Sequence, residues 1–124
     1  MREILFRGKR PTGEWAEGNL TRIGDYALIG VPMSPHLSVI PETVGQYTGL
    51  TAHGKKIFEG DIVTGLFLFG LSVNAVVTFQ DGAFGLEWYR GGIKTFNAFT
   101  TICNVEYEVI GNIHDNPELL KGGE

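Results

Sequence analysis

The strongest constraint on the fold is the dipeptide Asp81-Gly82, which separates two runs of strand-forming residues. The run VVTFQ precedes it and the run AFGLEWY follows it. Asp-Gly tolerates the positive φ angles that a two-residue turn between antiparallel strands requires. In the second run Phe84, Leu86 and Trp88 alternate with other residues and therefore share one face of a strand. The sequence predicts a β-hairpin here.

Glycine spacing extends this prediction to the whole chain. The 124 residues include 18 glycines, about twice the usual share, and they are dispersed without a triplet period. Dispersed glycines among β-branched and aromatic residues are typical of many short strands joined by tight turns. We therefore expect an all-β fold built from hairpins in one domain spanning residues 1–124, a length that can bury a core without disulfides or metals.

Further strands are expected on both sides of the central hairpin. Residues 3–10 and 14–20 read as two strands joined by the turn Pro11-Thr12-Gly13, and residues 25–31 read as a third. Three prolines make residues 32–41 an irregular connection, and residues 43–47 fit either a turn of helix or a strand.

The last third of the chain is less regular in its signals. Arg90-Gly91-Gly92 is a turn, residues 93–103 are ambiguous, and Val105, Tyr107 and Val109 alternate with two glutamates as in a half-buried strand. Asn116 as N-cap and Pro117 at the first helical position predict a short C-terminal helical turn. Leu119 and Leu120 are expected to hold this turn on the sheet.

The stretch from Ile62 to Phe79 contains 18 residues without a charge, which reaches the lower limit for a transmembrane helix. Interrupting glycines and many β-branched or aromatic residues favour two strands instead, with a turn near residues 70–74. Leu66-Phe67-Leu68-Phe69 lacks polar alternation. We expect that strand to be covered on both faces, by the core on one side and by a loop or another subunit on the other.

The segment Gly49 to Lys56 reads G-x-x-x-x-G-K-K, one residue short of the P-loop pattern. A P-loop needs a Ser or Thr after the lysine and a helix whose N-terminal N–H groups bind phosphate. Here Lys56 takes the Ser/Thr place, and Gly60 with β-branched residues after it opposes a helix. We interpret His53-Gly54 as a hairpin turn with both lysines in solvent.

Other candidate sites are weak. Glu59 and Asp61 would share one strand face and could bind a metal or divide acid and base roles, but a bend at Gly60 with Asp61 accepting backbone N–H groups explains the same pattern. Three histidines and one cysteine stand in separate segments without ligand spacing, so we expect no metal, no cofactor and no catalytic residue. They are His36, His53, His114 and Cys103.

Charge argues against non-specific nucleic-acid binding, because the net charge is −4 and the excess of acids lies in residues 63–124. A binding surface for nucleic acid stays open as an alternative if basic side chains and aromatic rings converge on one face of the fold. The basic residues are Arg7, Lys9, Arg10, Lys55 and Lys56, and the aromatic residues are Trp15, Tyr26, Tyr47, Trp88 and Tyr89.

Three segments in order, MREILFRGKR with GEW, VGQYTGL with GKKIFEGDIV, and YEVIGNIHDNPELL, resemble the YopX family of bacteriophage and prophage proteins. One departure is that Ala52 stands where the family usually has an acid, in a shorter loop. The resemblance implies a mainly β fold with a small, partly open barrel, and it brings no catalytic residue. Its signature residues, interpreted as structural, are Gln46, Tyr47, Thr48, Gly49, Leu50, Gly54, Lys55, Glu59, Gly60, Asp61, Gly111, Asn112, Asn116 and Pro117.

The resemblance implies a phage or prophage accessory protein, and the lack of a recognisable site predicts that it is not an enzyme and acts as a protein-interaction module. We expect a homo-oligomer, with a phage or host protein as a further partner and no membrane partner. A nucleic-acid-binding β-barrel is the alternative, and an enzyme using Glu59 and Asp61 is the third reading. The charged N-terminal residues lack the pattern of a secretion signal, so we expect a cytoplasmic location.

Overall fold

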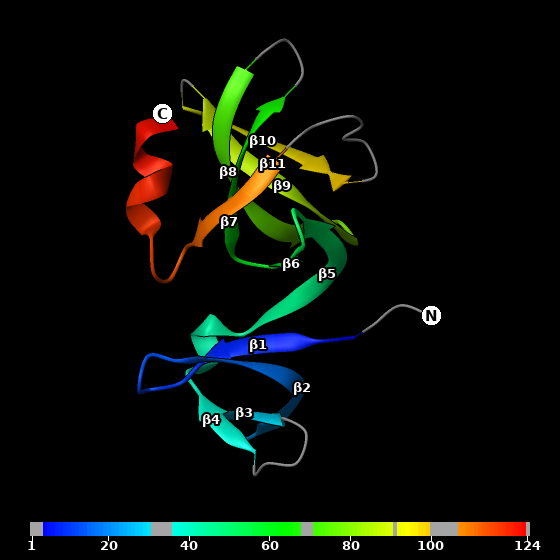
Figure 1. The fold of residues 1–124 in the computed structure, drawn as a ribbon, viewed down its shortest axis with the longest axis vertical. Coiled ribbons are helices and arrows are strands. Elements are labelled where there is room, and N and C mark those ends of the chain that lie inside the picture. Colours follow the sequence, from blue (N-terminus) through cyan, green and yellow to red (C-terminus); the bar gives the residue numbers. More distant parts are fainter. Residues whose placement is uncertain (1–3, 31–35, 68–70, 91, 100–106, 124) are drawn as a thin grey trace. The chain divides into compact units, whose positions relative to one another are not determined.

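A computed structural model describes residues 4–30, 36–67, 71–90, 92–99 and 107–123 of the chain. The chain folds into two compact units, Met1–Gly49 and Leu50–Glu124. Figure 1 shows both units as small groups of antiparallel strands, with a coiled C-terminal segment beside the strands of the second unit.

The first unit is built from hairpins that follow one another along the chain. Its strands lie in the order β4-β3-β2-β1-β5, and β5 continues into a pair with β6, which ends that sheet. The elements are β1 (Phe6–Lys9), β2 (Trp15–Ile23), β3 (Tyr26–Gly30), β4 (Leu37–Val39), the 3-10 turn η1 (Pro41–Thr43) and β5 (Gly45–Ala52).

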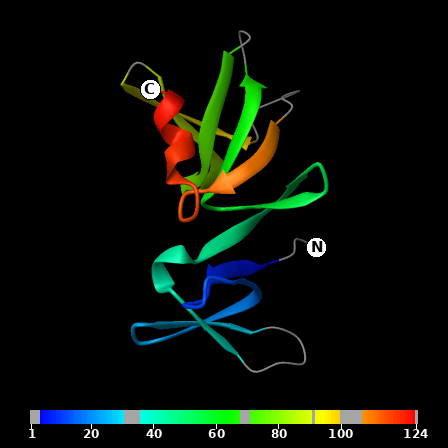
Figure 2. The ribbon, with the colours of Figure 1, turned by 60° about the vertical axis from the view of Figure 1, so that its left-hand side comes forward.

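The second unit contains a five-stranded antiparallel sheet in the order β10-β9-β8-β7-β11. Figure 2 shows this sheet from a second direction, with the C-terminal coil along its side. The elements are β6 (Lys55–Phe58), β7 (Asp61–Phe67), β8 (Leu71–Gln80), β9 (Ala83–Arg90), β10 (Ile93–Ala98), β11 (Tyr107–Asn112) and the 3-10 helix η4 (Pro117–Gly123).

The mainly β fold is thus confirmed, and so is the short C-terminal helical turn. The described strands form two open sheets and do not close into a barrel. Within the described part of the chain, each sheet ends on both sides in a strand that has a single neighbour. These strands are β4 and β6 in one sheet and β10 and β11 in the other.

The central hairpin forms as its Asp-Gly dipeptide predicts. Gln80 pairs with Ala83, so Asp81 and Gly82 make a two-residue turn with φ angles of 52° and 80°. These positive values at both positions are those of a type I′ turn, whose twist matches that of the strands. Leu86 on the return strand is completely buried.

Two local predictions need correction. Residues 37–39 form β4, although the prolines around them indicated an irregular connection; pairing of Leu37 to Val39 with β3 imposes the strand. Residues 71–74 belong to β8 and not to a turn. The side chains of Leu66–Phe69, expected to be covered on both faces, lie outside the described residues.

Each unit has its own core. In the first unit the buried side chains Ala16, Ala27, Ile29 and Val39 pack together. In the second unit the buried cluster is larger and takes in the β5–β6 hairpin as well as β7, β8 and β9; it consists of Ala52, Ile57, Val63, Ala75, Val77 and Leu86, with Trp88, Phe99, Tyr107 and Val109 packed around it.

The C-terminal helix η4 covers part of the five-stranded sheet. It lies against β8 and β9, and the side-chain amide of Asn74 donates a hydrogen bond of 2.8 Å to the carbonyl of Leu119. Leu119 and Leu120 are half-buried, as expected for residues that hold this helix on the sheet. In the part of the chain that the structure describes, no helix has the length and apolar character needed to cross a membrane.

Candidate functional site

The apparent P-loop is a hairpin turn. Ala52 ends β5 and Lys55 begins β6, with His53 at φ 50° and Gly54 at φ 80° between them. A strand follows the glycine in place of a helix, so no helical N–H groups converge there on a phosphate. Lys55 and Lys56 are exposed, as the hairpin interpretation predicts.

The Glu59-Gly60-Asp61 segment is a bend closed by a buried carboxylate. Gly60 has a φ of 93°, a conformation that favours glycine. Asp61 is 2% exposed, and its Oδ2 accepts a 2.8 Å hydrogen bond from the backbone N–H of Phe58. Glu59 is half-buried. The carboxylate of Asp61 is thereby committed to the backbone and turned away from solvent, which opposes an acid–base role.

The C-terminal signature forms a second hydrogen-bonded turn around Asn112. The Oδ1 of Asn112 accepts bonds from the N–H groups of His114 (3.0 Å) and Asp115 (2.9 Å), while its Nδ2 donates to Asp115 Oδ2 at 3.2 Å. Asn116 donates its N–H to the carbonyl of Asn112 at 2.8 Å. A Cβ on Gly111 would lie 2.5 Å from Asn116 Oδ1, which explains glycine there.

These two signature segments meet, although they lie far apart in the sequence. Asp61 of β7 pairs with Asn112 of β11, and Gly60 accepts a 2.9 Å hydrogen bond from the N–H of Ile113. Gly60 also donates its own N–H to Val77 at 2.8 Å. The junction joins β7, β8 and β11, and its buried side chains Asp61 and Asn112 accept hydrogen bonds from backbone N–H groups. These contacts hold the three strands together.

The signature residues of β5 differ in their burial. Tyr47 is 7% exposed and its N–H donates to the carbonyl of Leu5 at 2.8 Å. Thr48 is buried, Gln46 is half-buried and pairs with Phe6, and Leu50 is exposed. Gly49 has a φ of 91° within the strand, which accounts for glycine at that position.

Metal ligands do not gather in the described residues: no three His, Cys, Asp or Glu side chains there form a group that could hold an ion. His36 and His53 are exposed, and His114 is half-buried beside Gly60. Cys103 lies outside the described residues.

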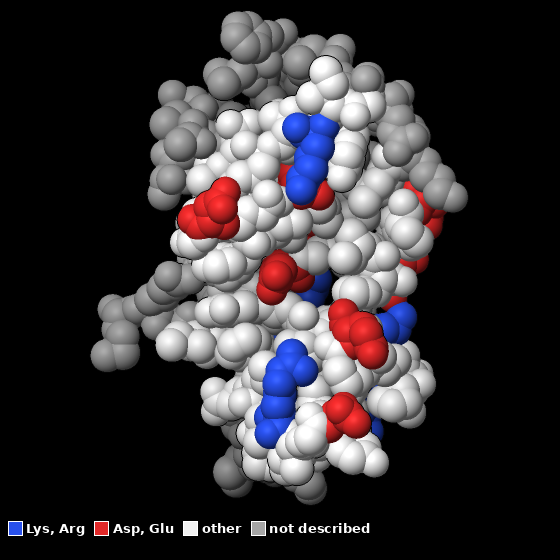
Figure 3. All heavy atoms as spheres, turned by 180° about the vertical axis from the view of Figure 1, so that it is seen from behind, with Lys and Arg blue, Asp and Glu red and all other residues white. Residues whose placement is uncertain are grey.

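Basic side chains do not dominate either unit. Arg7, Lys9 and Arg10 belong to the first unit, which carries five Lys/Arg and five Asp/Glu. Lys55 and Lys56 belong to the second, which carries five Lys/Arg and nine Asp/Glu. Figure 3 shows basic and acidic side chains interspersed on the face that it presents.

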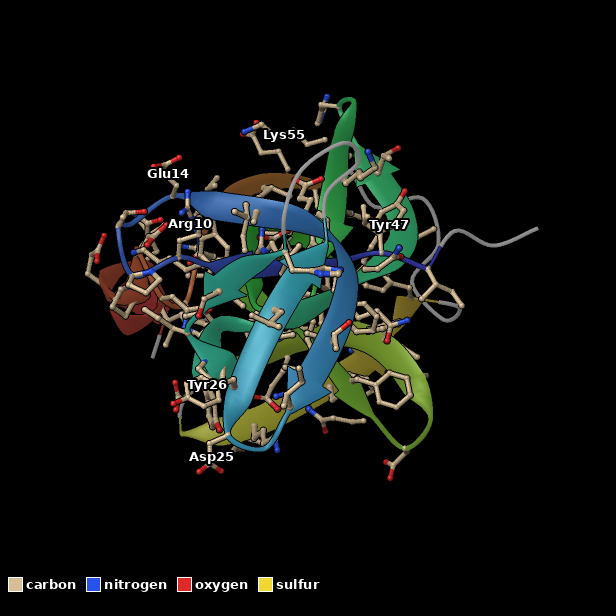
Figure 4. The ribbon with its side chains drawn as sticks, turned by 90° about the horizontal axis from the view of Figure 1, so that it is seen from below. Arg10, Glu14, Asp25, Tyr26, Tyr47 and Lys55 are labelled. Atoms are coloured by element: carbon tan, nitrogen blue, oxygen red, sulfur yellow. The ribbon has the colours of Figure 1, made fainter. Side chains whose placement is uncertain are left out.

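Two of these basic residues have partners close by. The guanidinium carbon of Arg7 lies 4.8 Å from the centroid of the Trp15 ring. Arg10 Nη1 lies 3.9 Å from Glu14 Oε2, across the turn that joins β1 to β2. Figure 4 labels Arg10 and Glu14 at this turn.

Exposed apolar side chains are a feature that the sequence reasoning missed. Ile23 is 59% exposed and Tyr26 is 69% exposed, and they pair directly at the tip of the β2–β3 hairpin. Figure 4 shows Asp25 and Tyr26 at this tip. The signal that could have identified them is Gly24-Asp25, a turn dipeptide with an apolar residue on each side.

A comparison with known protein families gives one match. The family model described as YopX protein matches residues 13–121 of this chain. No curated protein matches it.

Proposed function

Since the chain belongs to the YopX family, we propose that it is a phage or prophage accessory protein that works without catalysis, as a protein-interaction module. The observation that carries this proposal is the exposed pair Ile23 and Tyr26 at the β2–β3 hairpin tip. We name this pair the hairpin anchor.

The hairpin anchor has the chemistry of a binding hot spot. Tyrosine is enriched among the residues that dominate interface energies, since it buries a large ring and keeps a hydroxyl for a hydrogen bond. Its cross-strand neighbour Ile23 adds aliphatic surface on the same face of the hairpin. Leu28, half-buried, lies on that face as well. A protein partner that covers these side chains would remove apolar surface from water.

The absence of catalysis is supported by how the most suggestive polar groups are used. Asp61 and Asn112 are buried and hold backbone N–H groups of the fold. A catalytic carboxylate would need to reach a substrate in a cleft. Both side chains therefore serve the fold, which supports a role for the exposed apolar surface.

Affinity capture tests the proposal. Tagged wild-type chain is compared with the double variant Ile23→Ser/Tyr26→Ser in lysate of host cells that carry the phage, with bound proteins identified by mass spectrometry. Ile110→Ser, which changes another exposed isoleucine on β11, is the matched control. We expect a specific partner to be retained by wild type and control and lost by the double variant. Equal recovery by all three proteins, or no recovery by wild type, would reject the hairpin anchor.

A second candidate function, nucleic-acid binding, is favoured by one observation: the cation–π pair of Arg7 and Trp15 on a strand face that also carries Lys9. Such a face can contact phosphate and stack a base. Binding of single-stranded DNA or RNA at low salt that weakens with salt, and weakens further in Arg7→Glu/Lys9→Glu, would support it. Lys55→Glu/Lys56→Glu tests the second unit in the same assay. No binding at low salt would remove this candidate.

A further inference from the structure

The four edge strands of the two sheets differ in how they are protected. An exposed edge offers unpaired N–H and C=O groups to other chains, and proteins normally shield it by short length, lysines, bulges or charges. β4 has three residues. β6 carries the exposed Lys55 and Lys56. β11 contains a register shift between Val109 and Gly111 and the exposed Glu108.

β10 has fewer of these devices, with a single exposed lysine. It has six residues without proline and pairs with β9 without a register shift. Its one charged side chain, Lys94, is held by Glu87 of β9, with 3.2 Å between Lys94 Nζ and Glu87 Oε1. That ammonium group is drawn along the face of the sheet toward β9, away from the edge. Ile93, at the start of the strand, is 70% exposed.

The register determines which backbone groups of β10 are directed outward. Arg90 pairs with Ile93 at the end of the β9–β10 hairpin, and the closing pair of a two-residue hairpin exchanges hydrogen bonds. Because residues alternate along an antiparallel ladder, Thr95 also faces β9, while the N–H and C=O groups of Lys94 and Phe96 face away from it. Within the described residues no strand pairs with that side.

We propose that β10 pairs antiparallel with β10 of a second copy of this chain, with Thr95 on the two-fold axis. In this register Lys94 of one copy lies opposite Phe96 of the other. The outward groups of these two residues then meet their counterparts in both copies. The two five-stranded sheets would join into one continuous sheet. The inference rests on the proposed function, an interaction module, and names a second copy as one of its partners.

The self-pairing register follows from side-chain chemistry as well as backbone direction. A register centred on Lys94 would place two ammonium groups directly opposite each other, which is unfavourable. A register centred on Phe96 would require the backbone of Ala98, which already makes an interaction. Centring on Thr95 avoids both problems.

Cysteine cross-linking tests the register directly. In a Cys103→Ser background, Thr95→Cys would place two sulfur-bearing side chains opposite each other across the axis, at a Cβ separation of about 5 Å that a disulfide can bridge after small adjustment. Ile93→Cys is the matched control, because Ile93 is more exposed but would face Asn97 of the other copy. We expect a disulfide-linked dimer from Thr95→Cys and little from Ile93→Cys. Equal cross-linking of both, or none of either, would overturn the proposal.

Sedimentation over a concentration series tests the backbone pairing. Lys94→Pro removes an outward N–H group, which an edge strand tolerates but a paired strand does not. Lys94→Ala removes the side chain and keeps the N–H group. We expect dimers from wild type and Lys94→Ala and a folded monomer from Lys94→Pro, with circular dichroism confirming the fold. Should Lys94→Pro fail to fold, the cross-linking comparison decides. A wild-type monomer at every concentration would reject the β10 dimer.

The two proposals fail separately. A wild-type monomer that still captures a partner through Ile23 and Tyr26 would reject the β10 dimer and keep the hairpin anchor. A dimer that forms equally well in Ile23→Ser/Tyr26→Ser, with no partner captured by wild type, would reject the hairpin anchor and keep the β10 pairing.

Discussion

The two compact units differ in the size of their buried cores. Among the described residues, the first unit buries a cluster of four side chains, of which Ile29 is the largest. The second unit buries a cluster of six, including Leu86, Ile57 and Val77. Close backbone approach occurs in both units: a Cβ on Gly18 would overlap the carbonyl oxygen of Gly30, and a Cβ on Gly85 would overlap that of Asn97. The comparison teaches that core size distinguishes the units, whereas both require glycine where two strands come close.

The largest effect is expected from Leu86→Ala in the second unit. Leu86 is fully buried in the core, so truncation loses transfer free energy and leaves a cavity, at a cost of about 3 kcal/mol in the free energy of unfolding. Urea denaturation measures the loss, and hydrogen exchange locates it. If amide protection falls equally in β2–β3 and β7–β9, the two units unfold together, and their cores do not contribute to stability independently.

The reverse test adds a methyl group to the first unit. Gly18→Ala forces a Cβ against the backbone of Gly30, and such overpacking costs about 2 kcal/mol. Gly13→Ala would be a poor control for this substitution, because a side chain at the φ of 99° found at Gly13 would itself be strained. Ala16→Gly, which removes a buried methyl from the same strand, is the better comparison. Wild-type stability of Gly18→Ala would show that the close backbone approach is unimportant.

Each unit contains a buried side chain that accepts a backbone N–H, which allows a direct comparison of a charged acceptor with a neutral one. Asp61 accepts from Phe58 at 2.8 Å, and Thr43 Oγ1 accepts from Lys9 at 2.8 Å. Asp61→Ala should cost about 2 kcal/mol and Thr43→Val about 1 kcal/mol, because hydrogen bonds to charged groups are stronger. Chemical denaturation measures both.

The conservative variant Asp61→Asn separates charge from shape, since it keeps an oxygen acceptor. We expect a loss smaller than that of Asp61→Ala. Equal losses for the two Asp61 variants would mean that the negative charge itself provides the stabilisation.

The smallest effect concerns the pH dependence of the second unit. Burial raises the pKa of Tyr107 above its ordinary value of 10.0, so the unfolded chain ionises this phenol before the folded chain does. The associated stability is present below pH 10.0 and is lost as the pH rises through the folded pKa. Tyr107→Phe should therefore reduce the fall in unfolding midpoint measured above that pH. An identical fall in wild type and variant would show that other groups cause it.

Local chemistry by itself determined the turns. Asp81-Gly82 and His53-Gly54 both form two-residue turns with positive φ angles, because backbone preferences at such positions act over a few residues. The same holds for the turn at Pro11-Thr12-Gly13, closed by a 2.7 Å hydrogen bond from Arg10 N–H to Glu14. The all-β class and the C-terminal helical turn followed from these signals and from alternation.

Tertiary structure alone decided which strands became neighbours. β5 pairs with β1 and not with β4 before it, Asp61 meets Asn112, and three residues between prolines become a strand because β3 lies beside them. The position of β10 at the edge of its sheet, within the described residues, also emerges only at this level. The physical reason is that a turn depends on its own residues, whereas burial, strand partners and free edges depend on what the rest of the chain leaves uncovered.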